Sequence, residues 1–181
     1  MTSAYASTAS AADQGVTPVV QVFVGIGSNL SPRRNLRLAV RELQRRYGTL
    51  LLSPVYRNAA VYFEGADFLN MVAAFSTALP ALALSADFER IHELAGRVRD
   101  GEHLVSRTLD IDLLLYGEAV SQHPPLPRPD ILSYNFVLRP LAEIAPDVVH
   151  PLTGRTILEH WRESDDDSHP LERVSLDFGG Q

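Results

Sequence analysis

Apolar residues recur along the chain with two different periods, which predict strands interleaved with helices. Compact apolar runs that end at turn residues predict strands at 19–26, 49–57, 68–77 and 109–116. Apolar residues at helical spacing predict helices that begin at Pro32 and that cover 81–94, 136–144 and 157–161. We expect Ser31 to cap the first helix, and we expect a loop at 58–67, where no period is visible.

The order of these elements is strand, helix, strand, strand, helix, strand, followed by helices. It predicts an α+β fold, a ferredoxin-like αβα sandwich with a mixed or antiparallel sheet and split βαβ topology. The chain has 181 residues, of which 45% are apolar, and this is enough for one core. We expect a single domain at 18–161, after a disordered leader at 1–17 and before an acidic, flexible tail at 162–181.

The composition excludes several classes of function. A net charge of −6 and a pI near 5.4 give no general attraction to nucleic acid or to an anionic membrane. No apolar run reaches the roughly 18 to 20 residues that cross a bilayer. The chain has no cysteine and all 16 basic residues are arginine, which excludes disulfides, Schiff bases and a lysine-containing phosphate loop. We therefore expect no nucleic-acid or membrane partner, and the lack of cysteine fits a cytoplasmic location. We also expect small-molecule substrates. The sequence is silent on the oligomeric state, for which we favour a monomer.

Two acidic residues stand two positions apart in the last predicted strand. Because neighbouring residues of a strand face opposite sides, Asp110 and Asp112 project together while Ile111 enters the other face. Paired carboxylates repel unless a cation lies between them, and their oxygens suit Mg²⁺ shared with nucleotide phosphates. The spacing alone leaves a second interpretation open, in which the segment is an edge strand with two solvent-facing acids.

Three arginines, Arg97, Arg99 and Arg107, lie just before this strand, in or beside a segment at 96–106 without an apolar period. Arginines near paired carboxylates suit phosphoryl transfer, because its transition state spreads negative charge over several oxygens. Taken alone, they are better explained by surface ion pairs worth about 0 to 1 kcal/mol each. Together with the aspartates they favour a nucleotide site.

An aromatic ring and an amide share one face of the strand at 68–77. Phe68 offers a flat ring, and Asn70 offers both a donor and an acceptor, which the edge of a pterin or guanine requires. We group Phe136 with them as a candidate ligand-binding residue. An aromatic residue in a strand is more often part of the core, and the sequence alone leaves that alternative open.

Several short motifs occur along the chain in a fixed order. They are Gly27-Ser28-Asn29-Leu30, Tyr56-Arg57, Asp67-Phe68-Leu69-Asn70, Gly96-Arg97-Val98-Arg99, the stretch 107–117, and Phe136-Val137-Leu138 followed by Pro140-Leu141. From about Val22 to Trp161 the chain resembles the hydroxymethyl-dihydropterin pyrophosphokinase family of folate biosynthesis. The resemblance implies the αβα fold derived above. It also implies transfer of diphosphate from ATP to the hydroxymethyl group of 6-hydroxymethyl-7,8-dihydropterin, with release of AMP.

The resemblance also implies a role for each candidate residue. Asp110 and Asp112 would hold two Mg²⁺ ions that bridge the ATP phosphates. Their catalytic partners would be Arg97, Arg99 and Arg107, and ATP contacts would come from Arg99, Arg107, Ile111 and Arg128. The pterin would be bound by Asn58, Val61, Phe68, Asn70 and Phe136, with the two phenylalanine rings on either side of it. The segments 58–67 and 96–106 would close over the reactants as lids.

The chain departs from the family pattern mainly on the nucleotide and lid side. His92 stands where a glutamate is common, Arg128 where a histidine is common, and Tyr134 where an arginine is common. The stretch His103-Leu104-Val105-Ser106 replaces an arginine, a tryptophan, a glycine and a proline, and Asn58-Ala59 replaces Thr-Pro. Three functions therefore stay open: an active pyrophosphokinase, a divergent transferase acting on a related pterin, and a non-catalytic pterin-binding module.

Overall fold

Strands and helices alternate along the chain as the apolar pattern predicts. The computed structural model describes residues 18–61, 65–96, 108–165 and 169–179. Its first half contains β1 (Val20–Ser28), α1 (Pro32–Tyr47), β2 (Leu51–Leu52), β3 (Val55–Asn58), β4 (Phe68–Thr77) and α2 (Ala81–Leu94). Its second half contains β5 (Asp110–Tyr116), β6 (Ser121–Gln122), β7 (Pro125–Leu126), α3 (Asp130–Ser133), α4 (Asn135–Ile144), α5 (Ile157–Glu163) and β8 (Glu172–Val174).

The main sheet is antiparallel and runs in the order β5-β1-β4-β3-β8, with β2 paired to β4. The single strand predicted at 49–57 is wrong, because β2 and β3 are separate pieces with Ser53 and Pro54 between them. Proline has no N–H for a ladder, and Ser53 instead bonds to β4 through both its backbone and its hydroxyl. The break redirects the chain so that β3 leads toward the end of β4 that bears Phe68.

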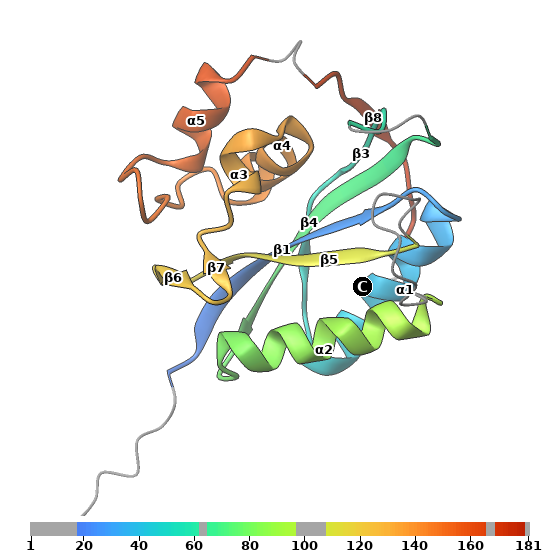
Figure 1. The fold of residues 1–181 in the computed structure, drawn as a ribbon, viewed down its shortest axis with the longest axis horizontal. Coiled ribbons are helices and arrows are strands. Elements are labelled where there is room, and N and C mark those ends of the chain that lie inside the picture. The colour runs from blue at the N-terminus through green and yellow to red at the C-terminus, as the bar shows by residue number, and fades with distance from the viewer. Residues whose placement is uncertain (1–17, 62–64, 97–107, 166–168, 180–181) are drawn as a thin grey trace, which may run out of the picture.

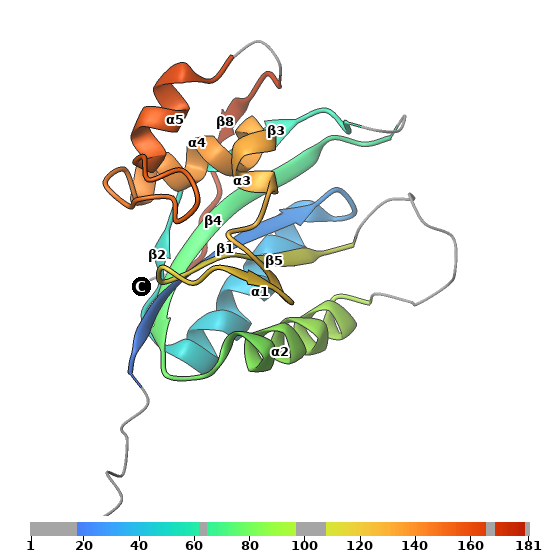
Figure 2. The same cartoon turned by 60° about the vertical axis from the view of Figure 1, so that its left-hand side comes forward.

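Helices cover both faces of this sheet, so the molecule has three layers (Figures 1 and 2). On one face, Val24 and Ile26 of β1 pack with Leu36 of α1 and Phe88 of α2. On the other face a second core forms around α4, and it includes Leu141. The predicted αβα sandwich is confirmed. Within the described residues, each helix is too short or too polar to cross a membrane.

The first helix begins where predicted, but Ser31 does not cap it in the expected way. Its side chain makes no capping hydrogen bond, and its backbone is in the left-handed region at φ 45°. The Ser31 carbonyl instead accepts the backbone N–H groups of Arg34 and Asn35, at 3.0 and 3.1 Å. The prediction of a side-chain cap is therefore wrong, whereas Pro32 occupies the first helical position as expected.

Residues 172–178 of the C-terminal segment pack against the sheet and α1, so the prediction of a flexible tail at 162–181 is wrong for this described part. α5 extends to Glu163, and β8 pairs with β3. Val174 is buried in the core on the α1 side, with Leu176 and Phe178 packed beside it. The side chains of Arg33 and Arg37 on α1 donate to the carbonyl oxygens of Ser175 and Asp177, at 3.1 and 2.8 Å. The expected leader at 1–17 lies outside the described residues.

Candidate functional site

A cavity of about 280 Å³ opens on the sheet face that carries α3 and α4. Its walls contain every residue predicted to bind a pterin, namely Asn58, Val61, Phe68, Asn70 and Phe136. They also contain Asp110, Asp112 and Arg128. The structure therefore brings together side chains from β3, β4, β5 and α4 that lie far apart in the sequence.

Two amides in the wall of this cavity hold each other in place. Asn70 Nδ2 donates to Asn58 Oδ1 at 2.6 Å, and Asn58 Nδ2 donates to the Ala59 carbonyl at 2.8 Å. Asn70 Oδ1 lies over Gly27 of β1, so closely that a Cβ added to Gly27 would be 2.5 Å from it. Glycine is thus required here for the close approach of the Asn70 carboxamide.

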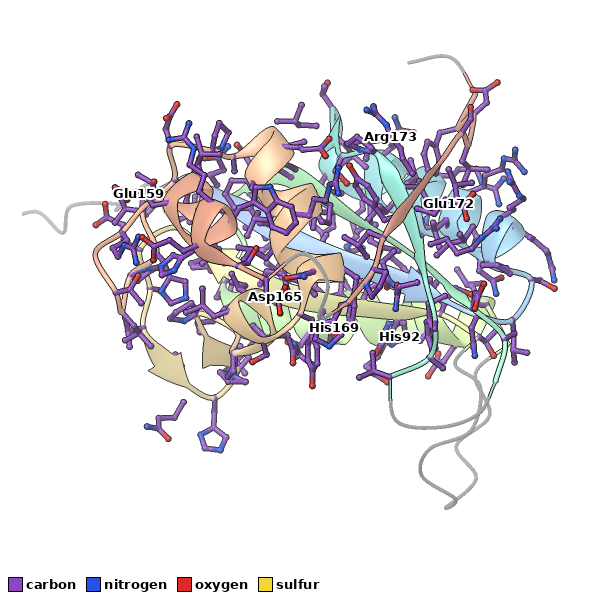
Figure 3. All side chains as sticks on the ribbon, turned by 90° about the horizontal axis from the view of Figure 1, so that it is seen from above. His92, Glu159, Asp165, His169, Glu172 and Arg173 are labelled. Atoms are coloured by element: carbon purple, nitrogen blue, oxygen red, sulfur yellow. The ribbon has the colours of Figure 1, made fainter. Side chains whose placement is uncertain are left out.

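Phe136 belongs to an aromatic cluster at the start of α4. Its ring stacks on Tyr134, with centroids 4.9 Å apart and planes inclined by 14°. His169, labelled in Figure 3, meets both rings edge-on, at 5.6 Å from Tyr134 and 6.1 Å from Phe136. Because these two distances are similar, His169 lies beside the stacked pair and does not extend it. His169 was not predicted, because its segment after α5 was expected to be a loose tail.

Asp110 and Asp112 project from one face of β5, as their spacing predicts. Both are partly exposed, whereas Ile111 between them is buried in the core on the other face. On the neighbouring strand they lie opposite Gly27 and Gly25, which have no side chains to cover them. Two adjacent carboxylates at the edge of an open cavity are a donor set that fits a hard divalent cation.

Arg128 contacts this pair. Its Nη2 lies 3.1 Å from Asp112 Oδ1, and its Nε also pairs with Asp130. The backbone N–H of Arg128 donates to the Leu114 carbonyl of β5 at 2.9 Å. The side chains of Arg128 and Asp112 are 28% and 32% exposed, so the ion pair is open to solvent.

A second cavity, of about 310 Å³, lies between α2 and β5. It is lined on the α2 side by Ser85, Phe88, Glu89 and His92, and on the β5 side by residues 110–113. Asp110, Asp112 and Arg128 border both cavities. The carboxylate pair therefore stands where the two hollows meet, which the sequence motifs could not reveal.

The Gly27-Ser28-Asn29-Leu30 motif positions the beginning of β5. Ser28 Oγ bonds to the carbonyl of Thr108, and Asn35 Nδ2 donates to the carbonyls of Leu30 and Thr108, each at 2.6 Å. Thr108 precedes Asp110 by two residues, so α1 and the turn after β1 jointly fix where the carboxylates start. The turn after the first strand was predicted from this motif, but the role of Asn35 was not.

Some predicted site residues lie outside the described ranges. Arg97, Arg99, Arg107 and His103 are among them, so their predicted roles stay predictions. Among the described residues, no three histidine, aspartate or glutamate side chains converge in a way that could hold a metal. The two aspartates would therefore supply part of a coordination shell, and phosphate oxygens and water would have to supply the rest.

The fold and site define a ferredoxin-like α+β protein with two adjoining cavities among the described residues. Residues 23–146 match the family described as 7,8-dihydro-6-hydroxymethylpterin-pyrophosphokinase (HPPK). The 2-amino-4-hydroxy-6-hydroxymethyldihydropteridine pyrophosphokinase of Synechocystis is 36% identical over 162 residues, which cover 87% of this chain and 83% of that protein. The Pseudomonas aeruginosa protein of the same name is 37% identical over 147 residues, with 78% and 90% covered. The chain belongs to the HPPK family.

Other relatives are longer proteins. The folic acid synthesis protein fol1 of Pneumocystis carinii is 31% identical over 168 residues, which are 87% of this chain but only 23% of that protein. The crystal structure of Plasmodium falciparum HPPK-DHPS superimposes with a TM-score of 0.64 at 11% identity and covers 81% of this chain and 45% of that one. At that identity the match supports the fold alone.

Proposed function

We propose that this chain transfers diphosphate from ATP to the hydroxymethyl group of 6-hydroxymethyl-7,8-dihydropterin and releases AMP. The observation that carries the proposal is the place of Asp110 and Asp112, at the junction of the two cavities. The pterin would occupy the cavity on the α4 side and ATP the cavity beside α2. The pterin oxygen would then bond to the β-phosphorus of ATP, the bond from that phosphorus to the α,β-bridging oxygen would break, and the hydroxyl proton would be released.

The lining of the first cavity suits a pterin. A pterin is flat and carries donors and acceptors along one edge, and the cavity offers the rings of Phe68, Phe136 and Tyr134 together with the Asn70 carboxamide. The bond to Asn58 fixes the orientation of that carboxamide before any ligand arrives. A preset amide loses less freedom on binding than a mobile one, which favours affinity and selectivity.

The carboxylates would act on the phosphates. We propose that Asp110 and Asp112 hold two Mg²⁺ ions, which when bound neutralise the triphosphate charge and orient it for attack. Arg128, beside Asp112, can turn its guanidinium to a phosphate oxygen, and Arg97, Arg99 and Arg107 are proposed to contact the phosphates as well. The activity is proposed to be cytoplasmic and the protein monomeric, which size-exclusion chromatography with light scattering would test.

The proposal is tested by following AMP release from Mg·ATP and 6-hydroxymethyl-7,8-dihydropterin. Asp110→Asn and Asp112→Asn are expected to lower kcat on the order of 100-fold or more, because an amide is a poor magnesium ligand. Pterin binding without ATP should stay within about threefold of the wild type, since the amides and rings remain. Asp147→Asn is the matched control, because Asp147 is exposed and lines neither cavity.

The outcomes separate the functions that the sequence left open. AMP release with another pterin but not with the hydroxymethyl compound would indicate the divergent transferase. Pterin binding without AMP release from any pterin would indicate the binding module. Equal loss of pterin affinity in both aspartate variants would contradict the metal role.

A further inference from the structure

The outer edge of β5 is held by contacts with segments that are not strands. β5 is the terminal strand of the described sheet, so its ladder to β1 satisfies only one of its edges. On the other edge, the backbone N–H of Ile111 donates to His92 Nε2 of α2 at 2.8 Å, and the Leu114 carbonyl accepts the backbone N–H of Arg128 at 2.9 Å. A buried N–H without an acceptor costs about 1 to 3 kcal/mol, so the His92 contact has a clear physical reason.

His92 is built into its place. Its side chain is 3% exposed, and its second ring nitrogen, Nδ1, lies 3.3 Å from Glu89 Oε1 one turn earlier on α2. Because Nε2 accepts the N–H of Ile111, the ring proton must sit on Nδ1, which donates to the Glu89 carboxylate. The imidazole is thus oriented from both sides, with its acceptor aimed at β5. Figure 3 labels its side chain.

The bonded N–H belongs to the peptide that joins Asp110 to Ile111. Fixing that peptide fixes the backbone between the two carboxylates, while Ile111 itself is anchored in the core at 4% exposure. His92 also lines the cavity beside α2, together with Asp110 and Asp112. One buried contact therefore lies directly behind the carboxylate pair, on the side where we place ATP.

We propose that His92 is a positioning residue, which holds the Asp110–Ile111 peptide so that Asp110 and Asp112 present their oxygens to a divalent cation shared with ATP. The inference rests on the proposed function, which supplies the cation and the nucleotide. His92 acts through Ile111 and touches neither reactant in this role. An ordinary packing residue would tolerate any side chain of similar size, whereas this role requires an acceptor atom at the position of Nε2.

Two conservative variants separate these roles. The Oε1 atom of glutamine is as many bonds from Cα as Nε2 is, so His92→Gln keeps an acceptor within reach of Ile111. The Oδ1 atom of asparagine is one bond shorter, so His92→Asn stays polar but loses the contact. His160→Gln is the control, because His160 lies on α5 and lines neither cavity.

The first measurement is amide hydrogen exchange of Ile111 in the protein without metal or nucleotide. His92→Asn is expected to speed this exchange about tenfold or more, and His92→Gln and His160→Gln to change it less than about threefold. Circular dichroism checks that each variant is folded. An unchanged Ile111 exchange rate in His92→Asn would overturn the proposal, and this result does not depend on enzyme activity.

The second measurement is binding of α,β-methylene-ATP, a non-cleavable analogue, at increasing Mg²⁺ concentration. His92→Asn is expected to raise the Mg²⁺ concentration for half-saturation about fivefold or more, with His92→Gln close to the wild type and pterin affinity unchanged within about twofold. If Ile111 exchanges faster in His92→Asn but the Mg²⁺ concentration for half-saturation is unchanged, the positioning role is overturned. A wild type that binds Mg²⁺ and the analogue but releases no AMP would contradict the proposed function alone.

Discussion

Gly27 lies so close to Asn70 that Gly27→Ala tests whether the Asn70 carboxamide binds the pterin. The added Cβ would be 2.5 Å from Asn70 Oδ1, whereas ordinary contacts begin at 3.4 Å. The carboxamide must therefore retreat by about 0.9 Å, the difference between these distances. Because β4 lies between β1 and β3, a retreat from Gly27 pushes the carboxamide toward Asn58 and crowds and misaligns their 2.6 Å bond.

The expected effect on pterin binding follows from this displacement. Misaligning a partly buried amide or losing its hydrogen bond costs about 1 to 2 kcal/mol, which raises the dissociation constant of the pterin about 5- to 30-fold. Fluorescence titration of 6-hydroxymethyl-7,8-dihydropterin without ATP measures this constant. The fold should hold, because alanine loses less conformational freedom in a strand than glycine does.

Gly25→Ala is the matched comparison on the same strand and in the same cavity wall. Its Cβ would meet the two methyl groups of Leu114 at 3.5 and 3.6 Å, which are ordinary contact distances. We expect Gly27→Ala to weaken pterin binding about fivefold more than Gly25→Ala does. Equal dissociation constants in the two variants would refute the reasoning, because the Asn70 carboxamide would then have moved without consequence for the ligand.

Two further predictions concern stability. Tyr56 is buried, and its hydroxyl donates to the Glu143 carboxylate. Tyr56→Phe should therefore lower the free energy of unfolding, measured by urea titration, by about 1 to 2 kcal/mol. An unchanged free energy of unfolding would show that this hydrogen bond does not stabilise the fold. Burial, and to a lesser extent the nearby His160, lowers the pKa of His150 below its ordinary value of 6.5. The unfolded chain therefore binds the proton more readily than the folded chain. As a result, the free energy of unfolding falls as the pH drops below 6.5. His150→Gln should flatten the decline between pH 7 and 5, and equal slopes for both proteins would contradict this.

The segments that the sequence located best are those whose own pattern decides their structure. β4 and α2 have the predicted bounds, 68–77 and 81–94, because a long apolar run and a helical repeat meet at Pro80, which ends one and precedes the other. Phe68 and Asn70 of the first cavity were also found, since residues two apart share a strand face by local geometry alone, whereas Asn58 and Val61 came from the resemblance.

The residues that the sequence missed depend on partners far along the chain. Asn35 bonds to the carbonyl of Thr108, 73 residues away, and no local pattern marks that contact. β8 pairs with the edge of β3, and Val174 of β8 is buried in the core. The acidic run that precedes β8 is instead typical of a flexible tail, which is why the strand was not predicted. Such contacts form only when the sheet assembles. The Gly27-Ser28-Asn29-Leu30 motif could therefore be recognised in the sequence, but its contact with Thr108 could not be predicted.

Arg128 decides whether the carboxylate pair can accept a cation. A guanidinium sealed over a buried carboxylate would exclude metal, but here Asp112 and Arg128 are 32% and 28% exposed. An ion pair open to solvent contributes about 0 to 1 kcal/mol, which direct coordination by a metal and a triphosphate can outweigh. The backbone of Arg128 is bonded to Leu114, so its side chain can turn to a phosphate while its main chain stays on β5. The contact therefore balances charge at Asp112 and is compatible with the proposed metal role of the pair.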